Sequence, residues 1–179
     1  MKKRYLFALF IVLLFVSCIK NDMKLLIMDE STKNFLNSII VCKNYNAKII
    51  DKNGYWIIEN ASEEMLVDIL IIIRLKLDIS ANNIANVNTT RTFEGGPFIR
   101  QYLKITPGNG IEIAKDTSAL TRFVWDPTHP DAIKTGAKEG YVELPNVDVV
   151  TEKVALEAYG RLYSAIAEYL KENYNVYVL

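Results

Sequence analysis

Apolar residues recur at helical spacing in two long stretches of the chain. The first stretch predicts a helix over residues 62–87, with alternating steps of four and three between Leu66, Leu70, Ile73, Leu77, Ser80 and Ile84. This alternation is the spacing of a coiled-coil seam. Additional isoleucines at 69, 71, 72 and 79 widen the apolar surface, so this helix needs cover on more than one side. A buried core helix would show the same periodicity.

The second stretch predicts a helix over residues 147–172, which Asn146 or Asp148 can cap. Its apolar positions also follow steps of three and four: Val147, Val150, Val154, Ala158, Leu162, Ala165 and Tyr169. We expect one set of interaction residues to pack on the other. The first set is Leu66, Leu70, Ile73, Leu77 and Ile84, and the second is Val150, Val154, Ala158, Leu162 and Ala165. A terminal strand is expected over residues 176–179.

Short apolar runs separated by Gly, Pro and Asn predict β structure elsewhere. Between the helices, residues 88–146 form a β-rich body with strands expected at 98–105, 111–113, 121–125 and 140–145. Before the first helix, residues 36–59 have the composition of β structure, and Asn53-Gly54 is a strong hairpin signal. The expected fold class is therefore α+β. Its long helices would pack as an antiparallel pair or coiled coil, with the body between them and an added N-terminal β-hairpin.

The first eighteen residues have the layout of a secretory signal. A basic start at residues 2–4 precedes an apolar run of twelve residues from Tyr5 to Val16, and then Ser17 and Cys18 follow. A Cys directly after a small residue predicts a lipoprotein, cut before Cys18 and acylated on its thiol. Acyl chains contribute roughly 0.8 kcal/mol per buried CH₂, so two or three anchor a protein firmly. An uncleaved anchor helix and an ordinary signal with a chance Cys remain alternatives.

The charge balance excludes a basic nucleic-acid-binding surface. The chain has 21 basic and 21 acidic residues, and removing residues 1–17 takes away three bases and no acids. That leaves 18 bases against 21 acids, so we expect no nucleic-acid partner. If Cys18 is acylated, Cys42 has no partner within the chain and is a small buried hydrophobe.

The candidate chemistry in the chain is sparse. His129 is the single histidine, and it lies in a proline-bracketed loop with Asp126 and Asp131. Zinc sites usually need three or four protein ligands, so we expect no metal site there. No nucleophile motif or phosphate-binding loop appears, and the glycines at 95, 96, 108 and 110 mark turns between strands. The sequence predicts a non-enzymatic protein without cofactors.

Four stretches of the sequence resemble flagellar basal-body rod proteins of the FlgC type. "LDISANNIANVNTTRT" with "GGPFIRQ" is similar to the exit of the first family helix, and "GYVELPNVDVVTEKV" is similar to the start of the last. "WDPTHPDA" at residues 125–132 joins them, and "GRLY" at residues 160–163 matches an Arg-x-Tyr element. The similarity covers about residues 61–166. It implies a structural protein of the bacterial flagellum that serves cell motility. In such a protein, the asparagines at 82, 83, 86 and 88 would end the helix and set the angle between helix and body.

The front of the chain departs from that family. Rod proteins pass through the flagellar export apparatus without a cleaved signal, whereas this chain has a lipoprotein-type signal over residues 1–17. The interpretation divides the chain into that signal, residues 18–60 as lipidated Cys, tether and hairpin, and residues 61–179 as a rod-like module. It implies a periplasmic, lipid-anchored protein whose partners are rod or basal-body proteins and copies of itself. The alternative is an envelope lipoprotein that keeps the rod fold as a scaffold unrelated to motility.

Overall fold

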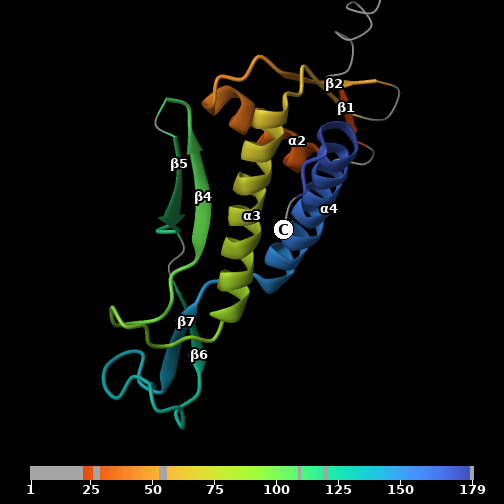
Figure 1. Ribbon diagram of the computed structural model, residues 1–179. Coiled ribbons are helices and arrows are strands. Elements are labelled where there is room, and N and C mark those ends of the chain that lie inside the picture. Colours follow the sequence, from red (N-terminus) through yellow and green to blue (C-terminus); the bar gives the residue numbers. More distant parts are fainter. Residues whose placement is uncertain (1–21, 26–28, 53–55, 109, 119–120, 178–179) are drawn as a thin grey trace, which may run out of the picture. The chain divides into compact units, whose positions relative to one another are not determined.

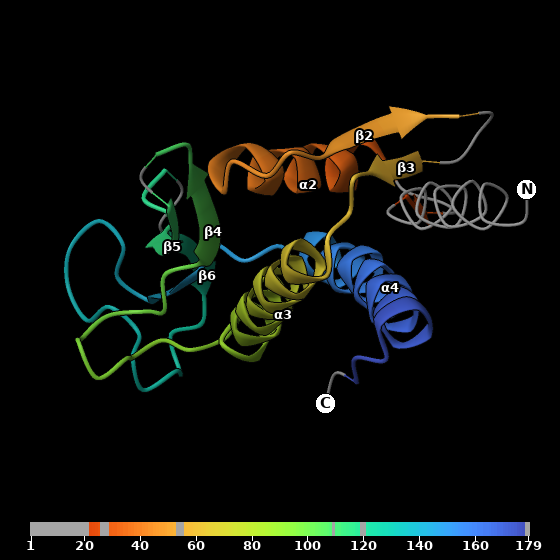
Figure 2. The same ribbon diagram turned by 45° about the horizontal axis from the view of Figure 1, so that its top comes forward.

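The computed structural model describes residues 22–25, 29–52, 56–108, 110–118 and 121–177 (Figures 1 and 2). These residues form an α+β structure with three helices and small antiparallel sheets. The chain divides into two compact units. Unit 1 comprises residues 1–69 and 165–179, and unit 2 comprises residues 70–164. Both long helices contribute residues to each unit.

Unit 1 contains a three-stranded antiparallel sheet. Its strands are β1 (Met23–Leu25), β2 (Lys48–Asp51) and β3 (Trp56–Glu59), in the order β1-β3-β2. Ile58 in the central strand β3 lies opposite both Met23 and Ile49. The predicted Asn53-Gly54 turn lies outside the described residues.

Helix α2 (Glu30–Cys42) corrects the sequence prediction, which placed β structure from residue 36 onward. The side chain of Asp29 caps the helix by accepting a hydrogen bond from the Thr32 backbone N–H at 2.8 Å. Within the misread segment, residues 39–42 are a short apolar run that fits either a strand or a buried helix. Its burial follows a helix, because Ile39 and Ile40 are buried while Val41 is 63% exposed.

The core of unit 1 combines all of its elements. The sheet, α2, the start of α3 (Glu63–Ala85) and the end of α4 (Val149–Tyr174) each bury apolar side chains. The fully buried ones are Met23, Leu36, Ile39, Ile58, Met65, Leu66, Ile69, Ile166 and Leu170. The Tyr174 hydroxyl also donates a hydrogen bond to the Ala61 carbonyl at 3.1 Å. The N-terminal segments therefore cover helix ends that would otherwise expose apolar surface.

The long helices begin at the caps that the sequence offers. The Ser62 hydroxyl accepts from the Met65 N–H at 3.3 Å and precedes α3. The Asp148 carboxylate accepts from the Val150 N–H at 3.0 Å and precedes α4. Asn175 follows α4 with a left-handed φ of 57°. Residues 176 and 177 belong to no strand, so the predicted terminal strand is absent at those two positions.

Unit 2 contains two separate two-stranded sheets. Strands β4 (Gln101–Thr106) and β5 (Gly110–Lys115) pair antiparallel, with Leu103 opposite Ile113. Strands β6 (Thr121–Trp125) and β7 (Tyr141–Pro145) pair antiparallel, with Trp125 opposite Tyr141. Figures 1 and 2 both show β4, rather than β5, on the side of α3. The strand that follows the asparagine-rich helix end is therefore the one held against the helix.

Candidate assembly site

Asn83 joins helix α3 to strand β4 through its side-chain amide. Its Oδ1 accepts from the Gln101 backbone N–H at 2.9 Å, and its Nδ2 donates to the Gln101 carbonyl at 2.8 Å. The same Nδ2 donates to Oε1 of Glu152 at 3.1 Å. The amide thus makes the pair of bonds that a neighbouring strand would make with Gln101. Asn83 is fully buried, so both the position and the direction of β4 are fixed at this point.

Glu152 extends this contact to helix α4 and to the basic residue Arg100. Its Oε1 accepts from Nε of Arg100 at 2.7 Å, and the two side chains form an ion pair. Arg100 also lies 3.5 Å from Oδ2 of Asp116, just after β5. We name Asn83, Arg100, Gln101, Asp116 and Glu152 the polar clamp. Because the Glu152 side chain is 2% exposed, removing its partner would leave a buried carboxylate unpaired, at a cost of about 3–5 kcal/mol.

Lys76 lies on α3 near the clamp. Burial lowers the pKa of Lys76, the negative charge of Glu152 opposes that shift, and the positive charge of Arg100 adds to it. Its ammonium is 5.8 Å from the centre of the Tyr159 ring. In unit 2, two contacts join α3 to α4: Asn83–Glu152 and Lys76–Tyr159. Lys76 lies seven residues before Asn83 on α3, whereas Tyr159 lies seven residues after Glu152 on α4, so the two helices run in opposite directions here.

Burial separates the ten predicted interaction residues into three groups. Leu66, Leu70, Ile73 and Leu162 are buried, and Leu77, Ile84, Ala158 and Ala165 are partly buried. Val150 and Val154 are 70% and 61% exposed, so the prediction that they pack inside the chain is wrong. The buried side of α4 passes instead through Glu152, Tyr159, Leu162, Ile166 and Leu170. The role of the ten residues in assembly stays a prediction.

The loop around His129 is held by local hydrogen bonds. The Asp126 carboxylate accepts from the Thr128 hydroxyl at 2.7 Å, and Nδ1 of His129 accepts from the Asp131 N–H at 3.0 Å. The Asp131 carboxylate accepts from the Thr90 hydroxyl at 2.8 Å and pairs with Arg91. These contacts tie the loop to the chain leaving α3. Among the described residues, no group of His, Cys, Asp and Glu is arranged to hold a metal ion.

Sequence reasoning missed four members of the clamp as site residues: Arg100, Gln101, Asp116 and Glu152. Hydrophobic periodicity passes over them because they are polar, and Glu152 occupies a buried helix position. One signal was present. An asparagine such as Asn83, inside a helix, needs partners for its amide once it is buried. Four asparagines were predicted to set the angle at which the body leaves the helix, and among them Asn83 is the buried one.

The predicted membrane tether has no structural counterpart among the described residues. Residues 1–17 and Cys18 lie outside them. No described helix has the length and apolar character needed to cross a bilayer. Lipidation of Cys18 therefore stays a prediction from the sequence.

Comparisons with known proteins agree with the resemblance in the sequence blocks. Residues 73–91 match the family described as "Flagella basal body rod protein". The "Flagellar basal-body rod protein FlgC" of Borreliella burgdorferi is 41% identical over 115 residues. The proteins of the same description from Bacillus subtilis and Escherichia coli are 32% identical over 117 residues and 31% identical over 104.

The matched regions cover unequal shares of the chains. They take in 75% of each of these three relatives but 51–53% of this chain. The matched residues 73–91 contain Asn83 and lie within unit 2. About half of the chain therefore lies outside its similarity to these relatives.

Proposed function

The chain belongs to the FlgC family of flagellar basal-body rod proteins, and we propose that it acts as a membrane-tethered structural component or accessory of the rod. In this role it holds other basal-body proteins by shape and contact rather than by chemistry. The observation that carries the proposal is the similarity to rod proteins over three-quarters of their length. The polar clamp supports it, since a rigid angle between helix and hairpin suits a part that must repeat one geometry.

In this proposal α3 and α4 form an antiparallel pair with a coiled-coil-like seam. Two observations in unit 2 support the pairing. The contacts from Asn83 to Glu152 and from Lys76 to Tyr159 are one heptad apart on both helices. A seven-residue repeat is the period that keeps a seam facing its partner. Ile73 and Leu162, both buried, would then belong to this seam.

Acylation of Cys18 would place the module at a membrane surface in the periplasm. The basic start, the apolar run and Ser17-Cys18 support this part of the proposal. The residues between Cys18 and residue 60 would act as tether and added domain, and residues 61–179 as the rod-like module. The expected partners are other rod or basal-body proteins, with copies of the chain as a further partner.

Fractionation of flagellar basal bodies tests the role. A tagged chain should sediment with purified basal bodies from wild-type cells. In a strain that builds no rod, the chain should remain in the membrane fraction and no longer sediment at the position of basal bodies. If the chain is absent from intact basal bodies, the envelope-scaffold alternative replaces the rod role.

Mass spectrometry of the mature amino terminus tests the tether separately. The expected product begins at Cys18 and carries the mass of its acyl chains. A Cys18→Ser variant should be neither acylated nor cut before residue 18, and it serves as the control. A wild-type product that keeps residues 1–17, or that begins elsewhere without lipid, contradicts the tether and leaves the rod role to the fractionation.

A further inference from the structure

Strands β6 and β7 present an aromatic face to solvent. Side chains alternate between the two faces of a sheet, so Phe123, Trp125 and Tyr141 share one face. On the opposite face, Val142 is buried. On the aromatic face, Trp125 is 61% exposed and the other two are 37% exposed. We name these three residues the aromatic face. Exposed apolar groups gathered in this way mark interaction sites.

Trp125 is held in place although it is exposed. Its ring packs edge-on against Tyr141, with the ring centres 5.2 Å apart. On the other side it lies on Gly140, where an added Cβ would come within 2.4 Å of the indole. Gly140 has a φ of +81°, which also favours glycine. A fixed aromatic side chain loses little conformational freedom on binding, which suits it as an anchor.

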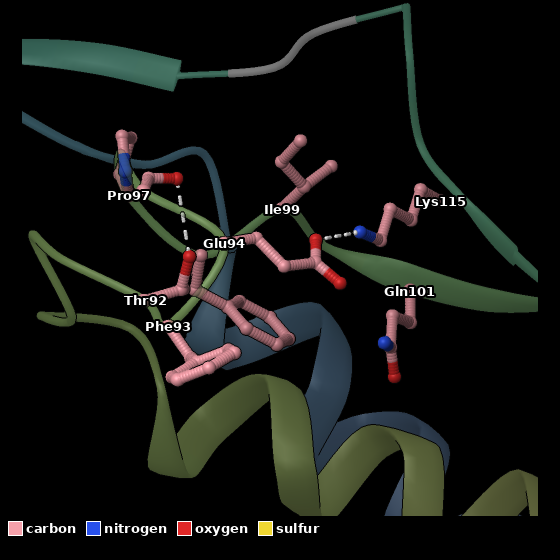
Figure 3. A pocket seen from close by; sticks show the side chains of 9 residues that line it. Thr92, Phe93, Glu94, Pro97, Ile99, Gln101 and Lys115 are labelled. Carbon is pink, nitrogen blue, oxygen red and sulfur yellow. Dashed lines mark hydrogen bonds and ion pairs between the residues drawn. The ribbon is translucent and has the colours of Figure 1, made fainter.

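A hollow of about 310 Å³ lies elsewhere in unit 2, between the loop after α3 and the β4–β5 hairpin (Figure 3). Pro97, Phe98 and Ile99 supply apolar walls, and Phe93 at the rim is fully exposed. The other lining residues are Thr92, Glu94, Gly95, Gln101 and Lys115. The volume is at the lower limit of sites that enclose a small ligand, roughly 300–1,000 Å³, and is ample for one aromatic side chain.

The charges beside the two surfaces are complementary. Figure 3 shows Glu94 and Lys115 meeting at the hollow, where their side chains are 74% and 49% exposed and 2.7 Å apart. Beside the aromatic face, the exposed Lys138 lies 3.2 Å from the centre of the Phe123 ring, and Glu143 lies opposite Phe123 in the sheet. Each surface thus has one acid and one base next to an apolar centre, and the two can pair with opposite signs.

We propose that the aromatic face of one copy docks in the hollow of a second copy, with Trp125 as the inserted side chain and Lys138 against Glu94. Because the two surfaces differ, the contact is heterologous and leaves one free surface at each end. Such contacts build open chains of copies unless the rotation closes a ring. The inference rests on the proposed function, which it deepens by giving the module a way to add copies.

The first test measures association of the full chain in mild detergent by sedimentation over a concentration series. The wild-type chain should form species beyond the dimer. Trp125→Ala should weaken association by at least about tenfold, as loss of a central aromatic anchor does. Val124→Ala, on the opposite face of β6, should leave it unchanged. A wild-type chain that stays monomeric at high micromolar concentration overturns the proposal.

A charge exchange separates the contact from a folding defect. Lys138→Glu should weaken association because it places an acid against Glu94. Adding Glu94→Lys to that variant should restore it, since the pair is then reversed. A double variant as weak as the single one, with both folded by circular dichroism, overturns the predicted pairing.

Photocrosslinking locates the partner surface. A benzophenone amino acid at position 125 should give crosslinked peptides from residues 92–101 of a second copy. Crosslinks that map only to the helices contradict the inference. Fractionation distinguishes failure of this contact from failure of the rod role. If the chain does not self-associate but still sediments with basal bodies, the proposed contact is wrong and the rod role stands.

Discussion

At the scale of single residues, one buried amide links three segments of unit 2. Asn83 bonds the backbone of Gln101 in β4 and the carboxylate of Glu152 in α4. An unsatisfied buried polar group costs about 1–3 kcal/mol. Asn83 therefore contributes to stability mainly because its loss would leave its buried partners without a hydrogen bond. The neighbouring Asn82 is exposed, and its side chain bonds the side chains of Gln101 and Asn86 instead of the backbone of β4.

Asn83→Ala should therefore lower the free energy of unfolding by about 2–4 kcal/mol, because it strands the N–H and the carbonyl of Gln101. Asn82→Ala is the matched control, and it should change stability by no more than about 0.5 kcal/mol. Urea denaturation of both variants measures the difference. Equal stability of the two would mean that the clamp does not hold β4.

Gly140 offers a second test at this scale. Gly140→Ala adds a Cβ within 2.4 Å of the Trp125 ring and also strains a positive φ. Gly136→Ala strains a similar φ of +93° but meets no atom within 4 Å, so it isolates the backbone term, roughly 1–2 kcal/mol. We expect Gly140→Ala to be the less stable variant and to change the Trp125 fluorescence, measured with Trp56→Phe as background. Matching spectra for the two variants would contradict the contact between Gly140 and Trp125.

At the scale of elements, the helices show what periodicity can and cannot assign. The predicted range 62–87 is close to Glu63–Ala85 for α3, and the predicted range 147–172 is close to Val149–Tyr174 for α4. The starts were predictable because Ser62 and Asp148 are recognisable N-cap residues in the sequence. The buried side of α4 was misassigned because two stripes compete. One includes the exposed Val150 and Val154, and the other includes the buried Glu152, which hydrophobicity rejects.

The remaining differences have equally local causes. Helix α2 was missed because its apolar run is short and its cap, Asp29, lies well before that run. Its burial depends on the sheet packed against it, which no window of the sequence contains. The strands of the body were expected close to where β4 to β7 lie, since glycines and prolines mark their turns. The clamp was not predictable as a set, because its members lie far apart in the chain.

Ile73 and Ile71 give the test for α3, because they differ in burial and not in chemistry. Ile73 is fully buried and Ile71 is 62% exposed. Ile73→Asp should cost about 4 kcal/mol or more, through the lost apolar burial and a carboxylate without a partner. Ile71→Asp should stay within about 0.5 kcal/mol. Circular dichroism with urea measures both, and an Ile73→Asp chain that unfolds at the wild-type urea concentration would exclude Ile73 from the core.

At the scale of the whole molecule, the stretch that matches the rod-protein family falls in one of the two units. The matched residues 73–91 lie within unit 2, whereas the sheet of β1, β2 and β3 and helix α2 lie in unit 1. Unit 1 has its own polar contact. The Tyr45 hydroxyl donates to Asp68 on α3 at 2.7 Å, and Lys43 pairs with the same carboxylate at 3.1 Å.

This contact predicts a pH dependence of stability with two limits. The hydrogen bond from Tyr45 holds the pKa of Asp68 below its usual 3.8, so its contribution is present above that value and is lost as the pH falls through the lowered pKa. Burial, followed by the bond to Asp68, raises the pKa of Tyr45 above its usual 10. The neutral phenol therefore stabilises unit 1 below pH 10, and that contribution is lost as the pH rises through the raised pKa.

Asp68→Asn should flatten the loss of stability below about pH 4, and Tyr45→Phe should flatten the loss above about pH 10. Thermal unfolding from pH 2 to pH 12 measures both limits. Glu59→Gln is a control carboxyl in the same unit, and it should leave both limits in place. Unaltered acid unfolding in Asp68→Asn would show that other carboxyls set the acid limit.

The bonds between Asn83 and Gln101 reach only the main chain of β4. Any amino acid other than proline presents the same N–H and carbonyl at position 101. The outer surface of the hairpin can therefore change its sequence widely while its orientation is retained. The surface residues of β5 could therefore be exchanged to recruit a different neighbour without changing the angle between the β4–β5 hairpin and α3.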